Sequence, residues 1–162
     1  MLLAKEFHPV LNESENHMTL QSCTFPSNTV RQRTVLLVED EPFVREATCS
    51  ILESAGFQVL PAENAADAME IYGGCNRHID LVMTDMVLLG RTGRQLADDL
   101  RQLSPQLKVL VTSGYGNAEY ATEELASQIY FLAKPYSRRG LIEKIEKILA
   151  TMPLGRAAGQ AG

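Results

Sequence analysis

Short apolar runs alternate with segments of helical periodicity along the chain, and this alternation constrains the fold more than any other feature of the sequence. Each run is only four to six residues long, which favours a buried strand over an independent helix. Polar residues directly follow most of these runs. The predicted strands span residues 34–38, 57–60, 81–84, 107–112 and 129–133.

The predicted helices follow these strands, and residues suited to helix ends flank them. Pro42 suits a first helical turn, because its missing N–H would be unpaired there in any case. Asn64 and Ser137 are expected to cap helices. Gly73–Gly74 and Pro105 are expected to end helices. The helices are predicted over residues 42–55, 65–72, 93–104, 118–125 and 138–150, and residues 86–92 are predicted to form a loop.

Five strands that alternate with five helices predict one α/β domain: a parallel sheet with helices on both faces and right-handed crossovers. We expect a flavodoxin-like strand order of 2-1-3-4-5. In such a sheet, ligands bind beyond the carboxyl ends of the strands, where the strand order reverses. The fold therefore predicts a binding site at the ends of the first and third strands.

The chain divides into one predicted domain and two flanking segments. Its 162 residues are enough for a single domain with a full core and some extra length. Residues 1–33 are mostly polar and are interrupted by prolines, which predicts a flexible N-terminal arm. We expect the folded domain at residues 34–150 and a flexible tail, rich in Gly and Ala, at residues 151–162.

Charge and composition argue against several classes of protein. The net charge of −5 disfavours a nucleic-acid or anionic-membrane partner. No apolar run approaches the ~20 residues of a membrane helix. Cys23, Cys49 and Cys75 are far apart and match neither a zinc site nor a disulfide framework. The expected location is therefore a reducing cytoplasm.

Charged and hydroxyl side chains stand at four of the predicted strand ends. Glu39 and Asp40 follow the first strand, and Asp85 follows the third. Ser113 and Lys134 follow the last two strands. Because the carboxyl ends of parallel strands meet at one edge of a sheet, we expect these five side chains to converge.

Three carboxylates at one edge require a compensating charge. Two charges ~4 Å apart repel by roughly 4 kcal/mol at an effective dielectric of about 20, so either the acids take up protons or a divalent cation binds. Magnesium suits a site of oxygen ligands that keeps several waters. With the Lys134 ammonium and the Ser113 hydroxyl, such a site can bind phosphoryl oxygens. Asp85 is then the expected nucleophile.

Four motifs together resemble the receiver domain of bacterial two-component response regulators. The resemblance covers about residues 34–150, and every motif lies at a predicted strand end. The Ser-Gly-Tyr form of the third motif also resembles receivers attached to hybrid histidine kinases. The motifs are Val-Leu-Leu-Val-Glu-Asp-Glu-Pro at 35–42, Leu-Val-Met-Thr-Asp at 81–85, Val-Leu-Val-Thr-Ser-Gly-Tyr at 109–115 and Lys-Pro-Tyr at 134–136.

The resemblance implies a magnesium-dependent phosphoacceptor site. Asp85 would accept a phosphoryl group from the phosphohistidine of a histidine kinase or a histidine phosphotransfer protein. Asp40 would bind Mg²⁺ directly, and Glu39 would act through water. The carboxylate of Asp85 and the backbone carbonyl of Val87 would complete the protein ligands.

The resemblance also implies a hydroxyl, a cation and an aromatic switch. Ser113 would move toward the phosphoryl group, and Lys134 would hold one of its oxygens. Thr112 is a rival for the hydroxyl role, although Gly114 fits the small residue that follows the family's Ser or Thr. Phe131 stands where the family has its aromatic switch.

Phosphorylation is expected to shift the face formed by the fourth helix, the fifth strand and the fifth helix, and so to reach a downstream protein. Exposed candidates on that face are Tyr120, Arg138 and Arg139.

Departures from the family's pattern lie beside the acceptor. Leu89 and Arg91 stand where the family usually has Pro and Met, so the loop is expected to have another shape or a specialised partner. Val87 and Tyr115 occupy positions where polar residues elsewhere in the family orient the hydrolytic water. An apolar Val87 predicts a long-lived phosphorylated form.

The expected function is a stand-alone phosphoacceptor module, without DNA-binding or enzymatic output in this chain, that catalyses only its own phosphorylation and dephosphorylation. One alternative is a receiver-shaped interaction protein that is never phosphorylated, which Leu89 and Arg91 keep open. Another is an aspartate-nucleophile phosphatase, but Val87 stands where those enzymes have a second Asp. A nucleotide-binding domain is disfavoured, because no Gly-rich loop follows the first strand.

Overall fold

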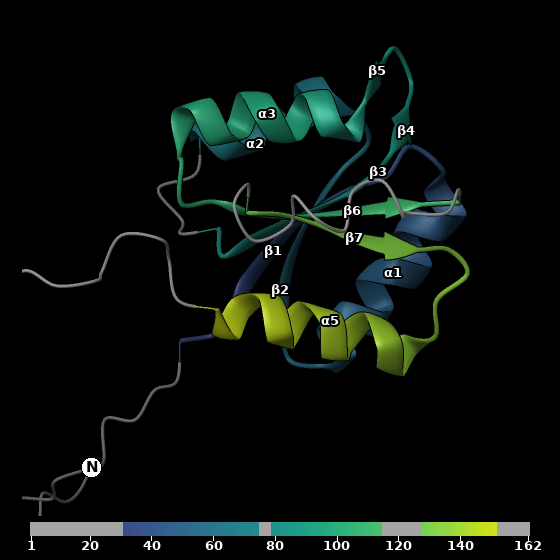
Figure 1. Ribbon diagram of the computed structural model, residues 1–162. Coiled ribbons are helices and arrows are strands. Elements are labelled where there is room, and N and C mark those ends of the chain that lie inside the picture. Colours follow the sequence, from purple (N-terminus) through teal and green to yellow (C-terminus); the bar gives the residue numbers. More distant parts are fainter. Residues whose placement is uncertain (1–30, 75–78, 115–127, 152–162) are drawn as a thin grey trace, which may run out of the picture. The chain divides into compact units, whose positions relative to one another are not determined.

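The structure is a computed structural model that describes residues 31–74, 79–114 and 128–151. Its central element is a parallel sheet with the strand order β2-β1-β3-β6-β7. This order is the expected 2-1-3-4-5, so the predicted fold class is confirmed (Figure 1). The strands are β1 (Thr34–Val38), β2 (Gln58–Ala62), β3 (Leu81–Asp85), β6 (Lys108–Ser113) and β7 (Ile129–Ala133).

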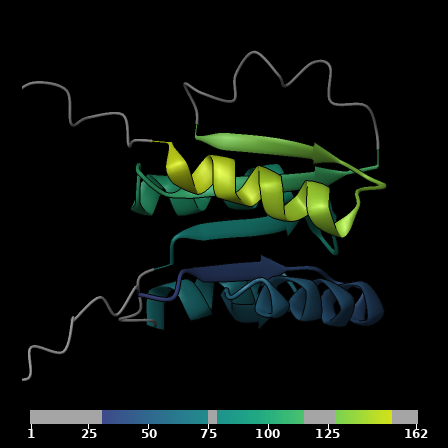
Figure 2. The ribbon, with the colours of Figure 1, turned by 90° about the horizontal axis from the view of Figure 1, so that it is seen from below.

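Helices cover both faces of this sheet, as Figures 1 and 2 show. One face carries α1 (Pro42–Ser54) and α5 (Arg138–Ala150), and the other carries α2 (Ala65–Gly74) and α3 (Gly93–Leu103). Across the described residues, none of the helices has both the length and the apolar character that crossing a membrane requires. The predicted helix at 118–125 and the predicted arm, apart from residues 31–33, lie outside the described residues, as does the tail beyond residue 151.

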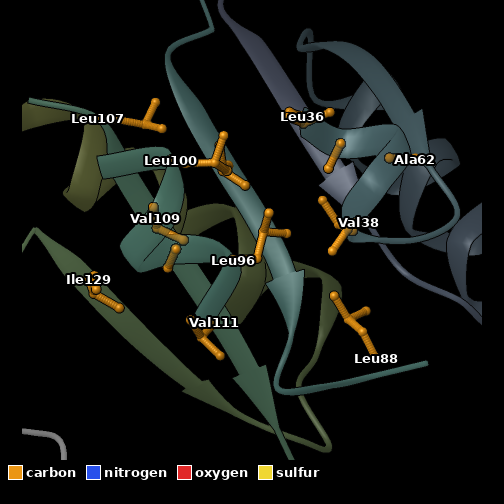
Figure 3. Packing of buried hydrophobic residues seen from close by; sticks show 14 of the residues in the cluster. Leu36, Val38, Ala62, Leu88, Leu96, Leu100, Leu107, Val109, Val111 and Ile129 are labelled. Atoms are coloured by element: carbon orange, nitrogen blue, oxygen red, sulfur yellow. The ribbon is translucent and has the colours of Figure 1, made fainter. Parts of the chain in front are cut away.

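The core has two halves because alternate residues of each strand point to opposite faces. In β1, Leu36 and Val38 belong to the cluster under α2 and α3, whereas Val35 and Leu37 belong to the cluster under α1 and α5. Figure 3 shows side chains of the sheet gathered with Leu96 and Leu100 of α3 in the first cluster. Strands that are buried on both faces have continuous apolar sequences, and this is the signal that located them.

Helix α2 ends at Gly74, in agreement with the prediction that Gly73 and Gly74 end it, whereas β2 differs from its predicted bounds. Strand β2 extends to Ala62 and includes Pro61. A proline lacks the N–H that a central strand needs, but β2 lies at the edge of the sheet and tolerates it.

The predicted loop at 86–92 contains a small hairpin that the sequence analysis missed. Strands β4 (Val87–Leu88) and β5 (Arg91–Thr92) pair antiparallel around a two-residue turn. Gly90 in this turn has a φ of 84°, a conformation that favours glycine. Leu88 is buried in the core, whereas Val87 is 68% exposed and Leu89 is 78% exposed. The hairpin therefore presents two apolar side chains beside the end of β3.

The capping residues predicted for two helices are confirmed. Asn64 Oδ1 accepts hydrogen bonds from the backbone N–H groups of Ala66 and Asp67 at the start of α2. Ser137 Oγ accepts one from the N–H of Gly140 at the start of α5. These bonds satisfy donors that the first turn of a helix leaves unpaired.

Two charged residues hold the side of the sheet where the amino ends of the strands lie, which we call the amino edge. Asp80 accepts a hydrogen bond from the backbone N–H of Thr34 at 2.7 Å and pairs with Arg31. Lys108 Nζ donates to the carbonyl oxygens of Thr151 at 2.6 Å and Leu149 at 3.3 Å. Lys108 thus joins the start of β6 to the end of α5.

Candidate functional site

The predicted strand-end residues gather at the carboxyl edge of the sheet. Glu39 and Asp40 directly follow β1, and Asp85 is the last residue of β3. These two strands are neighbours, with Val38 paired with Thr84. The switch point of the fold therefore brings the acidic residues together from positions more than forty apart in sequence.

Lys134 joins two of these carboxylates. Its Nζ lies 3.3 Å from Asp85 Oδ1 and 3.4 Å from Glu39 Oε2. Its backbone N–H donates to the carbonyl of Ser113 at 2.7 Å, which fixes the lysine against the end of β6. The side chains of Glu39 and Asp85 are only 7% and 19% exposed, so little water screens the contact.

Burial and charge act in opposite directions in this cluster. Burial raises the pKa of Glu39, the nearby Asp85 raises it further, and Lys134 only partly offsets them. Burial alone would lower the pKa of Lys134, but the attraction of Asp85 and Glu39 outweighs it, and the pKa of Lys134 is raised. Lys134 is therefore a firmly protonated cation, whereas the Glu39 carboxylate is held in its charged form at a cost.

Asp85 is held by the backbone of the residue that follows it. Its Oδ1 accepts a hydrogen bond from the Met86 N–H at 2.8 Å. The same N–H lies 2.7 Å from the carbonyl oxygen of Thr112 on β6. Within the described residues, the recorded contacts of the Asp85 carboxylate therefore fall on Oδ1.

Gly93 lets α3 begin directly against this backbone. A Cβ at this position would lie 2.0 Å from the carbonyl oxygen of Asp85 and 2.9 Å from Thr84 Oγ1. The N–H of Gly93 donates to the carbonyl of Met86 at 2.9 Å. The sequence pattern predicts Gly93 only as a helix start, and its position eight residues after Asp85 carries no further signal.

The two candidate hydroxyl groups differ in their surroundings. Thr112 is 1% exposed, and its hydroxyl donates to the carbonyl of Thr84 at 3.4 Å inside the sheet. Ser113 is the last residue of β6 and lies next to Lys134 through the backbone bond described above. This arrangement favours Ser113 over Thr112 for a role at the edge. Phe131 lies on β7 and is 4% exposed, within the cluster under α2 and α3.

The donor set fits a hydrated magnesium ion better than a metal enclosed by protein ligands. Glu39 and Asp85 share Lys134, and Asp40 is half-buried directly beside Glu39. Over the residues that the structure describes, no three His, Cys, Asp or Glu side chains form a ready metal cluster. Mg²⁺ keeps several waters and needs only one or two carboxylates. Three acids against one ammonium leave the excess negative charge that such an ion would balance.

The sequence did not predict Arg45 beside the site, where its Nη1 donates to the carbonyl of Glu39 at 2.7 Å. Tyr136 of the predicted Lys-Pro-Tyr motif lies there too, and burial raises the pKa of its hydroxyl, which is hydrogen-bonded to Thr48 on α1. The position of Arg45 could have indicated its role, because a cation in the first turn of a helix interacts unfavourably with the helix dipole and is therefore expected to have a local partner.

The unusual residues after the acceptor are accommodated by the hairpin. Arg91 pairs with Asp99 of α3 at 2.6 Å, which ties β5 to that helix. Leu89 is the exposed residue of the turn. In the structure this loop is a two-stranded hairpin with an apolar tip, and the expected difference from the family's loop stays a prediction.

Two of the three predicted output residues are described. Arg138 is exposed and donates to Ser54 Oγ of α1 at 2.9 Å. Arg139 is exposed and pairs with Glu143 one turn further along α5 at 2.6 Å. Tyr120 lies outside the described residues.

Comparisons with known proteins agree on one family. The family model described as the response regulator receiver domain matches residues 35–146. The chain is 34% identical over 117 residues to the sensor kinase CckA of Brucella abortus (strain 2308), and the match covers 72% of this chain but 12% of that protein. It is 30% identical over 116 residues to the response regulator receiver protein CpdR of the same organism, covering 71% of this chain and 95% of that protein.

A solved structure shows the same fold. The response regulator protein TrrA from Thermotoga maritima, crystallised in complex with Mg²⁺ and BeF, superposes with a TM-score of 0.63. The two chains are 26% identical, and the match covers 72% of this chain and 99% of that one. The chain thus shares its fold with a protein whose described complex contains magnesium.

Proposed function

Because the chain belongs to the response regulator receiver family, whose members are signalling domains, we propose that it accepts a phosphoryl group on Asp85 in a magnesium-dependent reaction. The donor is the phosphohistidine of a histidine kinase or a histidine phosphotransfer protein. The observation that carries this proposal is the position of Lys134 Nζ, within 3.4 Å of both Asp85 and Glu39. Residues that far apart in sequence have no structural need to share one partly buried cation.

The chemistry is an in-line transfer between two nucleophiles. An oxygen of the Asp85 carboxylate bonds to phosphorus while the bond from phosphorus to the donor nitrogen breaks, and that nitrogen keeps the electron pair. Both recorded contacts of the carboxylate fall on Oδ1, so we assign the attack to Oδ2. Lys134 then holds a phosphoryl oxygen in place of its contact with the carboxylate.

The acidic residues and the hydroxyl have separate tasks. Asp40, Asp85 and the carbonyl of Val87 would hold Mg²⁺ directly and Glu39 would act through water, and the ion would supply positive charge to neutralise the phosphoryl oxygens. Ser113 donates its hydroxyl to another of these oxygens. Neutralisation and positioning are the main contributions that this transfer requires from a protein.

The phosphoryl group changes the conformation because it adds charge and acceptor oxygens at one place. Ser113 moves toward the group, and Phe131 on the neighbouring strand rearranges with it. The shift reaches the surface around β7 and α5, where a downstream protein binds. We place the reaction in the cytoplasm, since Cys49 is a free thiol and the sequence carries no disulfide framework.

The test is direct phosphorylation in the absence of a kinase. The purified protein is incubated with Mg²⁺ and acetyl phosphate or phosphoramidate, and the intact mass is measured. One phosphoryl increment is expected on the wild type, and none is expected on Asp85→Asn or after chelation of Mg²⁺. Asp98→Asn, which removes an exposed carboxylate from α3, is the matched control and should be phosphorylated normally.

Other outcomes separate the alternatives. A protein that folds, binds Mg²⁺ and gains no phosphoryl group from any donor would be an interaction module. Release of inorganic phosphate from simple phosphomonoesters, without a stable increment in mass, would identify a phosphatase. An increment that persists in Asp85→Asn would place the acceptor elsewhere and refute the proposal.

A further inference from the structure

The segment between β1 and α1, residues Glu39 to Glu41, is fastened at its backbone by one arginine; we call this segment the acid loop. Helix α1 has no side-chain cap. The Glu39 N–H donates to the Ala62 carbonyl at 3.2 Å, and the Glu41 N–H donates to Glu39 Oε1 at 3.4 Å. The carbonyls of the segment are held by Arg45, whose Nη1 donates to the carbonyl oxygen of Glu39 at 2.7 Å and lies 3.5 Å from that of Asp40. One guanidinium therefore holds two successive carbonyls of the segment that carries two of the acids.

The same guanidinium is anchored on its other side. Arg45 Nη2 lies 3.2 Å from Glu63 Oε1, in the loop between β2 and α2. The Arg45 side chain is only 15% exposed, whereas that of Glu63 is 71% exposed. A pair with such an exposed partner contributes little to stability. Because the guanidinium is a planar and rigid fork, however, the anchor at Nη2 fixes the direction from which Nη1 meets the acid loop.

The two cations beside the acid loop act on different atoms. Lys134 contacts the carboxylates of Glu39 and Asp85. Arg45 contacts backbone carbonyls. Burial raises the pKa of Glu39, and the charges that modify it are chiefly those of Lys134 and Asp85. Arg45 therefore acts on the acid loop mainly through its geometry.

We propose that Arg45 is a positioning residue that sets the affinity of the acid loop for Mg²⁺. It fixes the peptide groups from which the Glu39 and Asp40 carboxylates project, and Glu63 orients it. This inference rests on the proposed function, because it takes the acid loop as the magnesium-binding segment. Removing a residue that orients a metal ligand without contacting the metal typically lowers metal affinity by roughly 10- to 100-fold.

Titration calorimetry with MgCl₂ tests this role without any phosphodonor. Arg45→Met keeps the apolar stem and removes the fork, and Arg45→Lys keeps the charge but not the fork. Both are expected to raise the Kd for Mg²⁺ by about ten-fold. Glu63→Gln, which leaves the acid loop untouched, should raise it by a smaller factor. Arg139→Met, which removes an arginine with an 87% exposed side chain from α5, is the matched control and should leave the Kd unchanged.

A second measurement separates positioning from loss of the fold. The phosphorylation yield from acetyl phosphate is measured against Mg²⁺ concentration for the same variants. If Arg45 positions the acid loop, the midpoint rises by the same factor as the Kd, and the yield at saturating Mg²⁺ returns to that of the wild type. A yield that stays low at saturation would indicate general structural damage and would overturn the proposal.

The remaining outcomes also decide the matter. If Arg45→Met binds Mg²⁺ with the wild-type Kd, the inference is wrong. If only Arg45→Lys keeps the wild-type Kd, the charge of residue 45 matters and its fork geometry does not, which also overturns the inference. If Arg45→Met does not fold, the Kd of Glu63→Gln for Mg²⁺ decides: a raised Kd supports the inference, and a wild-type Kd overturns it. If the wild type is phosphorylated with Mg²⁺ and the Arg45 variants keep the wild-type Kd for Mg²⁺, only this inference is refuted. A wild-type chain that neither binds Mg²⁺ nor gains a phosphoryl group refutes the proposed function as well.

Discussion

At the scale of single residues, the site is an imbalance of charge held in a partly buried place. Lys134 is one ammonium between the carboxylates of Glu39 and Asp85, and Asp40 adds a third acid. The excess negative charge of such a cluster costs stability, and a bound divalent cation would offset that cost. The sequence predicted which residues meet, because topology alone brings strand ends together.

The first prediction concerns the pH dependence of stability. The pKa of Glu39 is raised in the folded protein, so its contribution to stability is fully present below its ordinary pKa of 4.5 and is lost as the pH rises through the folded value. Glu39→Gln should therefore be more stable than the wild type at pH 7, with a difference that shrinks toward pH 4. Urea unfolding across this range, without Mg²⁺, measures the effect.

Adding Mg²⁺ provides the control for this experiment. The wild type should gain stability with Mg²⁺ at pH 7, and Glu39→Gln should gain less. Glu63→Gln removes an exposed carboxylate and should follow the wild-type pH profile. An equal loss of stability with rising pH in wild type and Glu39→Gln would contradict the assignment.

The second prediction concerns the lifetime of the phosphorylated form. Val87 is 68% exposed beside the acceptor and offers no polar atom in its side chain to orient water. Val87→Asn should shorten the lifetime by about ten-fold, less than the roughly 100-fold that a misplacement of ~1 Å can cost. Decay of the phosphoryl increment in intact mass, after removal of the donor, measures it.

Leu89→Asn is the matched control, because it makes the same change in polarity at the tip of the same hairpin. It should leave the lifetime unchanged. Equal lifetimes in the wild type and Val87→Asn would show that this position does not limit hydrolysis.

At the scale of elements, the long apolar strands were predictable and the smallest elements were not. The runs at 34–38 and 129–133 match β1 and β7 residue for residue, because a strand buried on both faces leaves a continuous signal. The β4–β5 hairpin has two residues in each strand, too few for a period to be visible. Helix α2 ends at Gly74, at the pair of glycines from which the sequence predicted its end.

The third prediction concerns the start of α3. A Cβ on Gly93 would lie 2.0 Å from the carbonyl oxygen of Asp85, so Gly93→Ala must displace either the helix or the acceptor. We expect a loss of stability of about 1–3 kcal/mol, as for overpacking in a core, together with slower phosphorylation at saturating Mg²⁺. Urea unfolding and the rate of mass increment measure the two effects.

Gly74→Ala in α2 is the matched control. A Cβ there meets nothing within 4 Å, so this change should be neutral or slightly stabilising, and phosphorylation should be normal. If Gly93→Ala behaved like Gly74→Ala, the close approach of α3 to the acceptor would have no consequence for the site.

At the scale of the whole molecule, the sheet separates the carboxyl ends of its strands, called the carboxyl edge, from their amino ends, called the amino edge. The carboxyl edge carries the acceptor and Lys134, whereas the amino edge is fastened by Asp80 and Lys108. The sequence placed the first edge correctly but gave no sign of the second. Lys108 lies in an apolar strand context, and its partners are backbone carbonyls, which no side-chain pattern reveals.

The fourth prediction is that the amino edge can be weakened without damaging the site. Lys108 is 8% exposed, and it donates to the carbonyls of Leu149 and Thr151 at the end of α5. Lys108→Met should lower the free energy of unfolding by about 1–3 kcal/mol. The phosphorylation rate at saturating Mg²⁺ should stay that of the wild type.

Lys147→Met removes an exposed lysine from the last turn of α5 and serves as the control, with a smaller loss of stability. A large fall in phosphorylation rate in folded Lys108→Met would contradict the separation of the two edges.

The fastening of the amino edge has a practical consequence for anything joined to this domain. Arg31 is bound at Asp80, and Thr151 is bound at Lys108, so both residues lie at the amino ends of the strands, opposite the end that carries Asp85. A fluorescent reporter or an affinity handle joined directly to either residue is therefore attached at the end of the sheet away from Asp85.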